Sequence, residues 1–124
     1  MHNLQNMKVW NKAIELSTIV YEIVLNFPVD ERYGLSSQIK RSVVSIASNI
    51  AEGAGRNSTN EFIHFLGIAN GSAYELQTQV VIAGKLKLLD LETTDRLCRQ
   101  IIEIQKMIFG LRNKLKNDVN KILG

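Results

Sequence analysis

Glu61 and His64 have a spacing that is typical of metal sites in helical bundles. Residues three apart lie on one face of a helix, and ferritin-like bundles use two Glu-x-x-His motifs and two further glutamates to bind two metal ions. The second motif is missing, because the only other histidine is His2, at the N-terminal end of the chain. The sequence therefore predicts no metal site, no other cofactor and no di-metal enzyme.

The segment Gly53-Ala54-Gly55-Arg56 precedes an expected helix start and could bind a phosphate through free amides. It lacks the Gly-Lys-Ser/Thr of a nucleotide-binding P-loop, so nucleotide hydrolysis is not predicted. The alternative is an ordinary helix cap and turn. Cys98 and the serines have no histidine placed as a base, which argues against nucleophilic catalysis. We expect a protein that is not an enzyme.

The location of the protein is indicated by its cysteine content and its apolar runs. Cys98 is the only cysteine, so the chain cannot form an intramolecular disulfide. The N-terminal segment lacks the features of a signal peptide, and no apolar run approaches the roughly 18 residues of a membrane span. These features favour a cytoplasmic protein.

Positive charge is concentrated near the C-terminus. The net charge of the chain is +3, and the segment from Arg96 to Gly124 carries seven basic and two acidic residues, a net charge of +5. Such asymmetry permits an anionic partner such as nucleic acid, although a solvated helix face would look the same. The candidate nucleic-acid-binding residues are Lys40, Arg56, Arg112, Lys114, Lys116 and Lys121.

Four helices are predicted by apolar residues that recur alternately at three and four positions. The first helix ends before Pro28, the second near Gly53 to Gly55, and the third between Leu88 and Asp90. The third begins at Ser58, whose pattern with Glu61 is a capping box. Short connections favour antiparallel neighbours, so we predict an all-α, up-down-up-down four-helix bundle with one domain over residues 1–124. The seams are Val9, Ala13, Leu16, Val20, Ile23 and Phe27; Leu35, Ile39, Val43, Ile46 and Ile50; Phe62, Leu66, Ala69, Ala73, Leu76, Val80 and Ala83; and Leu97, Ile101, Ile104, Ile108, Leu111 and Leu115.

A second, polar stripe lies opposite the apolar seam of the second helix, with a similar stripe on the third. Small side chains let helices approach closely, and buried polar groups need hydrogen-bond partners. We expect Arg41 or Arg56 to pair with Glu52 or Glu75, between helices or between subunits, so that Glu52→Ala destabilises more than Glu103→Ala. An exposed polar face and a ligand site are the alternatives. The predicted network is Arg41, Ser45, Asn49, Glu52, Arg56, Ser72 and Glu75.

The chain resembles the four-helix bundle proteins encoded within intervening sequences of bacterial 23S ribosomal RNA genes. The likeness spans nearly the whole chain and is densest from Gln38 to Leu76. One departure is Lys85-Leu86-Lys87, which stands where many relatives have a Leu-Gly pair after the third helix. The matching residues are Val9-Trp10 with Ala13, Phe27-Pro28, Tyr33-Gly34-Leu35, Gln38, Arg41, Ser45-Ile46, Asn49 to Gly53, Arg56, Phe65-Leu66, Ile68-Ala69, Gly71-Ser72 and Glu75-Leu76.

This resemblance implies a homopentamer around a central axis. The family is also similar to the accessory variability determinant proteins of diversity-generating retroelements, which form basic pentamers and bind nucleic acid and a reverse transcriptase. We therefore expect a homo-oligomeric bundle that binds structured RNA or a ribonucleoprotein. The alternative is a protein-binding assembly scaffold without affinity for nucleic acid. No membrane or small-molecule substrate is expected as a partner.

Overall fold

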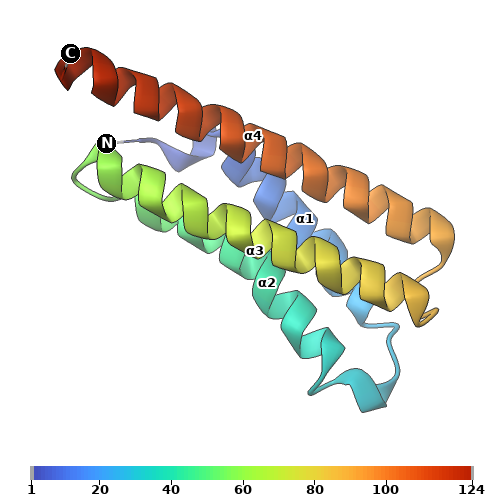
Figure 1. Cartoon of the computed structure of the whole chain (residues 1–124). Helices are drawn as coiled ribbons and strands as arrows, with labels where there is room; N and C mark the ends of the chain where they lie inside the picture. The colour runs from blue at the N-terminus through green and yellow to red at the C-terminus, as the bar shows by residue number, and fades with distance from the viewer. Residues whose placement is uncertain (1, 124) are drawn as a thin grey trace.

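Four long helices make up the protein, in agreement with the predicted all-α bundle. The computed structural model describes residues 2–123, and these contain no β-strand (Figure 1). Each helix runs opposite to the one before it, so the N-terminal segment, the α2–α3 loop and the end of α4 lie at the same end of the bundle. The elements are the short 3-10 helix η1 (Leu4–Asn6), α1 (Lys8–Val24), the 3-10 helix η2 (Val29–Glu31), α2 (Leu35–Ala54), α3 (Thr59–Lys85) and α4 (Leu91–Leu123).

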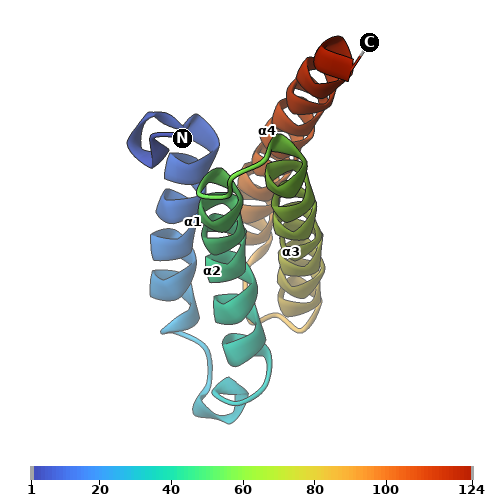
Figure 2. The same cartoon turned by 90° about the vertical axis from the view of Figure 1, so that its left-hand side faces the viewer.

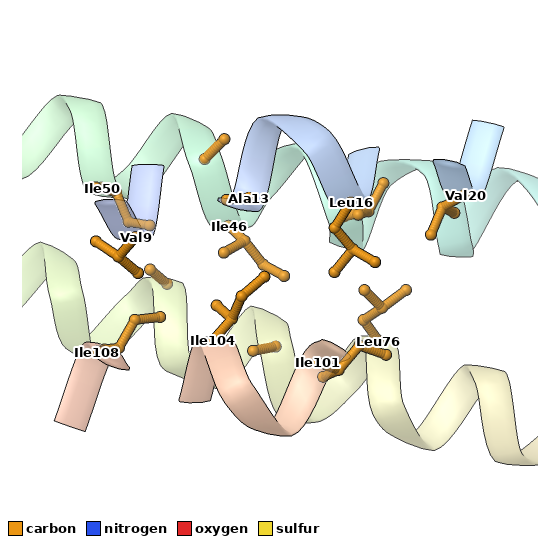
Figure 3. Packing of buried hydrophobic residues seen from close by; sticks show 14 of the residues in the cluster. Val9, Ala13, Leu16, Val20, Ile46, Ile50, Leu76, Ile101, Ile104 and Ile108 are labelled. Carbon is orange, nitrogen blue, oxygen red and sulfur yellow. The ribbon is translucent and has the colours of Figure 1, made fainter. Parts of the chain in front are cut away.

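The helices pack around one apolar core. α3 contacts α2 on one side and α4 on the other, and α1 completes the bundle against α2 and, over a smaller area, α4 (Figure 2). The predicted seams supply this core, as Figure 3 shows for Leu16 of α1, Ile46 of α2, Leu76 of α3 and Ile104 of α4. All four side chains are 2% exposed or less. Burial of such a side chain is worth about 1.5–3 kcal/mol, so the interior is the main source of stability.

The end of α1 lies earlier than its apolar seam suggests. The helix ends at Val24, and Phe27 is buried although it lies outside the helix. Pro28 disfavours a helical conformation at the residue before it, and the chain leaves the helix through hydrogen bonds from the amides of Asn26 and Phe27 to the carbonyls of Ile23 and Val24. The aromatic ring continues the seam from the loop.

α2 and α3 approach each other closely next to the loop that joins them. A Cβ atom added at Gly53 would lie 2.7 Å from Cβ of Phe65, so the helices meet here at a distance that only glycine permits. The next helix starts as predicted, with Oγ of Ser58 accepting a hydrogen bond from the amide of Glu61 at 3.1 Å. This junction fixes the position of the α2–α3 loop, which includes Arg56.

The end of α3 also lies earlier than predicted, at Lys85. Lys87 adopts a left-handed backbone conformation with φ of 62°. Its amide donates to the carbonyl of Gly84 at 3.0 Å, and the amide of Leu88 donates to the carbonyl of Ala83 at 2.9 Å. These two bonds form a Schellman motif, in which the left-handed position is usually glycine. The reversal of the chain at this point ends the helix before the predicted Leu88.

The end of α4 extends beyond the apolar core. Up to Ile122, Leu115 is the last residue of α4 that is buried among core side chains, and Lys116, Lys121 and Ile122 are all exposed. The final turns therefore project past the α2–α3 loop, as Figures 1 and 2 show. None of the described helices combines the length and the hydropathy that a bilayer span requires.

Candidate nucleic-acid interface and polar network

A set of hydrogen bonds joins α2 to α3 along the predicted polar stripe. The hydroxyl groups of Ser45 and Ser72 lie 2.8 Å apart, and Nδ2 of Asn49 donates to Oγ and to the carbonyl oxygen of Ser45 at 2.9 and 2.8 Å. Ser42 donates from Oγ to Oε1 of Glu75 at 2.6 Å. Ser42 is not among the predicted residues of the network, although Ser42, Ser45 and Asn49 recur at three and four positions and this spacing points to it.

The charged members of the predicted network behave differently. Arg56 and Glu52 form an ion pair at 2.7 Å within one helical turn, and their side chains are 41% and 55% exposed. Arg56 therefore pairs with Glu52, one of its predicted partners, but the pair does not join two helices of the chain, because Arg56 follows directly after the end of α2. Arg41 is exposed, and the structure shows no ion pair for it among residues 2–123.

The prediction about Glu52 and Glu103 also needs correction. Glu103 is not an isolated surface residue, because it forms an ion pair with Lys12 at 2.9 Å, and both side chains are about half exposed. Exposed ion pairs contribute little to stability because solvent screens them. The structure therefore provides no buried arginine that Glu52→Ala would leave without a partner.

A groove between α2 and α3 brings Arg41 and Glu75 to one site. It has a volume of about 470 Å³, and Gln38, Thr78, Gln79 and Ile82 complete its lining. The amide oxygen of Gln79 is buried there without a hydrogen-bond donor among the described residues. A second groove of about 330 Å³, between α3 and α4, is lined by Asn70, Tyr74, Ile102, Gln105, Lys106 and Phe109. Gln79 belongs to the polar stripe that the sequence indicates on the third helix, whereas Asn70 was not predicted as a site residue.

The candidate nucleic-acid-binding residues do not form one cluster. Lys40 lies on α2, with its ammonium 5.4 Å from the centre of the Tyr21 ring, and is separate from the others. On α4, Lys114 and Lys121 share one side at 100° per residue, whereas Lys116 is on nearly the opposite side. All three α4 lysines are exposed.

The two candidate arginines are held by neighbouring groups. The guanidinium of Arg56 lies over the Phe65 ring at 4.7 Å while it pairs with Glu52. Nε of Arg112 donates to the carbonyl of Ile63 at 3.3 Å, and the same side chain covers Gly67. Planar, fixed guanidinium groups suit phosphate recognition, but Arg112 already uses one donor on α3.

Charge is distributed unevenly along the axis of the bundle. The end that holds the α2–α3 loop and the tip of α4 has six basic residues and three acidic ones, and the opposite end has five basic and six acidic residues (Figure 1). The first end therefore attracts anions and the second does not. At the first end these residues are Lys8, Arg56, Arg112, Lys114, Lys116 and Lys121 with Glu52, Glu61 and Asp118; at the second they are Arg32, Lys85, Lys87, Arg96 and Arg99 with Glu22, Asp30, Glu31, Asp90, Glu92 and Asp95.

Residues considered for metal binding and nucleophilic chemistry have structural neighbours instead. Oε2 of Glu61 accepts a hydrogen bond from the Ser58 hydroxyl at 3.2 Å, and the ring of His64 packs edge-on against Phe65. Within residues 2–123, no three histidine, cysteine, aspartate or glutamate residues are grouped as a metal site requires. Burial raises the pKa of the Cys98 thiol, which keeps it in its unreactive, protonated form at neutral pH.

The family of the chain follows from comparison of its sequence and fold with known proteins. The family model of the 23S rRNA-intervening sequence proteins matches residues 5–110, which include α1, α2, α3 and most of α4. The chain belongs to the 23S rRNA-intervening sequence protein family. This assignment confirms the resemblance that the sequence motifs indicated. The matched region ends within α4, before Arg112 and the three α4 lysines.

A solved structure has the same fold as this family member. It is a protein of unknown function from the S23 ribosomal protein family of Bacteroides thetaiotaomicron, with 25% sequence identity and a TM-score of 0.76. The similarity covers 84% of this chain and 97% of the Bacteroides chain. No curated protein is detectably similar to the chain. Neither the family description nor that of the Bacteroides protein assigns an enzymatic activity.

Proposed function

We propose that this family member is a non-enzymatic, homo-oligomeric bundle, a pentamer, that binds structured RNA or a ribonucleoprotein in the cytoplasm. The observation that carries the RNA-binding part is the excess of basic residues at the end formed by the α2–α3 loop and the tip of α4. The cytoplasmic location is supported by the single cysteine, which excludes an intramolecular disulfide.

The proposed RNA contact is electrostatic. Lys114, Lys116 and Lys121 are exposed on the projecting end of α4, where they can reach phosphates of a large ligand. Their different directions around the helix suit a folded RNA that surrounds the tip better than a flat surface. Assembly would place several such tips together, and each phosphate contact would make binding more sensitive to salt.

The RNA-binding proposal is tested by fluorescence anisotropy with the full chain and labelled RNA hairpins, titrated across salt concentration. The family description makes 23S ribosomal RNA hairpins the first probe, and unrelated duplexes show whether binding is selective. We expect the logarithm of affinity to fall linearly with the logarithm of salt concentration. The variant Lys114→Glu with Lys121→Glu should reduce the slope by about one for each phosphate that the variant no longer binds.

A matched variant, Arg96→Glu with Arg99→Glu, makes the same charge change on α4 near the opposite end. It should retain the slope and most of the affinity. Equal losses of affinity in the two variants would show that only the total charge matters and would contradict the proposed location. Absence of binding at low salt would refute RNA binding and leave the alternative, a protein-binding assembly scaffold, as the proposed function.

A further inference from the structure

The outward side of α3 is almost without charge. Glu75 is the only charged residue of this helix between Phe65 and Gly84. The exposed positions carry apolar side chains instead, and Tyr74 is 57% and Ile82 43% exposed. A helix that is apolar on every side is normally covered by other protein. The surface, called the α3 face below, consists of Ile68, Gly71, Tyr74, Glu75, Thr78, Val81 and Ile82 with Phe109 of α4.

Two buried amide oxygens at the edges of the α3 face point to the same conclusion. Oδ1 of Asn70 lies in the α3–α4 groove and Oε1 of Gln79 in the α2–α3 groove, each without a donor among the described residues. The Gln79 side chain is 93% buried. A buried carbonyl oxygen without a donor is costly, so native proteins nearly always supply one. A partner that covers the α3 face could donate into both grooves.

A second surface with few charges lies on α1 and α2. Ile14, Thr18 and Tyr21 of α1 and Leu25, which directly follows this helix, are exposed and recur at four, three and four positions, so they form one stripe. This stripe borders Lys40, Val44 and Ser48 of α2, since Oγ of Ser17 donates to the carbonyl of Val43 at 3.3 Å and Lys40 lies over the Tyr21 ring. Lys40 is the only charged residue of this surface, called the α1–α2 face below.

We propose that the α3 face of one copy packs against the α1–α2 face of the next copy, with Lys40 opposite Glu75. This inference rests on the proposed self-association and names the surfaces that carry it. The charges are complementary in this arrangement, because the ammonium of Lys40 meets the carboxylate of Glu75 across a contact that is otherwise largely apolar. A contact between two different faces is the kind that closes into a ring.

The same arrangement offers hydrogen-bond donors to the buried amide oxygens of Asn70 and Gln79. The α1–α2 face presents the ammonium of Lys40 and the hydroxyl groups of Tyr21 and Ser48, which are all hydrogen-bond donors. Both faces lie along the sides of the bundle and not at its ends (Figure 2). The basic end, which the proposed function uses for RNA, therefore stays open when copies associate.

Charge exchange tests the arrangement with full-length protein, by light scattering and native mass spectrometry at micromolar concentration. Wild type should have a mass that is a multiple of 14.0 kDa. Glu75→Lys and Lys40→Glu should each reduce the mass to that of the monomer, and the double variant should restore the wild-type mass. Asp95→Lys and Arg99→Glu make the same charge changes on α4, outside both faces, and should assemble as wild type does.

Mixing the two single variants provides a control for folding. Each should be monomeric alone, and their mixture should assemble because the α3 face of Glu75→Lys then meets the α1–α2 face of Lys40→Glu with opposite charges. An odd-numbered ring cannot alternate two kinds of subunit, so the mixed species should be open or even-numbered. A misfolded variant would not assemble on mixing, and circular dichroism should show the same helix content in all samples.

The outcomes separate the two proposals. A wild-type monomer would refute self-association and with it the assignment of the faces. An oligomeric wild type whose mass is unchanged in Glu75→Lys and Lys40→Glu would leave self-association intact and overturn the faces. Single variants that are monomeric, with no recovery in the double variant or the mixture, would overturn the pairing of Lys40 with Glu75.

Discussion

The left-handed residue after α3 gives a direct prediction about stability. Lys87 has φ of 62°, a conformation that costs a residue with a side chain about 1–2 kcal/mol relative to the right-handed one. Glycine lacks this cost but loses about 0.5–1 kcal/mol through the greater freedom of the unfolded chain. Lys87→Gly should therefore raise the free energy of unfolding by about 0.5–1 kcal/mol. For a domain of this size the melting temperature should rise by about 2–5 °C.

The measurement is thermal unfolding by circular dichroism at one fixed protein concentration, because the proposed association would make the melting temperature depend on concentration. Lys87→Ala keeps a Cβ atom and should leave the melting temperature close to that of wild type. Lys85→Gly makes the same chemical change at the last helical residue of α3 and should lower it. A Lys87→Gly variant that melts at or below the wild-type temperature would refute the strain argument.

Three further predictions concern helix contacts, ion pairs and acid stability. Gly53→Ala should destabilise the bundle by about 1–3 kcal/mol in denaturant titration, because the added Cβ atom would clash with Phe65. Gly110→Ala should stabilise the bundle, because the space around Gly110 is open. A Gly53→Ala variant with wild-type stability would contradict the close approach of the helices. Glu52→Ala and Glu103→Ala should each change the melting temperature by less than about 2 °C, and a large drop for Glu52→Ala alone would indicate a buried pair after all. The amide of Thr93 donates to Asp90 Oδ1 at 2.7 Å and lowers the pKa of Asp90. The stability that this bond contributes is therefore present above the usual pKa of 3.8 and is lost as the pH falls through the lower pKa of the folded state. Asp90→Ala should flatten that part of a curve of stability against pH, and an unchanged curve would contradict the assignment.

The helices and their core could be predicted from sequence because burial follows the spacing of apolar residues. Leu16, Ile46 and Ile104 lie at predicted seam positions and are buried. The ends of helices depend on local conformations that residue types specify less strictly. Lys87 occupies a position that favours glycine, and no rule based on residue type would place a left-handed turn at lysine.

The contacts of the candidate site were harder to predict, because several partners are within reach of each polar side chain. Glu52 and Arg56 are four apart, which allows an ion pair within one turn as well as a longer contact between helices. Ser42 bonds to Glu75 as Ser45 bonds to Ser72, and only its spacing from Ser45 indicates this in the sequence. The faces of the proposed assembly do not follow from periodicity alone, because an exposed apolar stripe resembles a buried one in the sequence.

The unequal contacts between the helices also affect how the bundle opens. Helices that follow one another in the sequence share the larger contacts. The contact between the first helix, α1, and the last, α4, is the smallest of these four helix–helix contacts. Separation of α1 from α4 therefore breaks less packing than separation of α2 from α3. Partial unfolding starts preferentially where the packing is weakest. We expect backbone amides of the α2–α3 hairpin to exchange with deuterium most slowly and those of α1 to exchange earlier. A ring in which α1 is held by the next copy would slow exchange in α1 most of all.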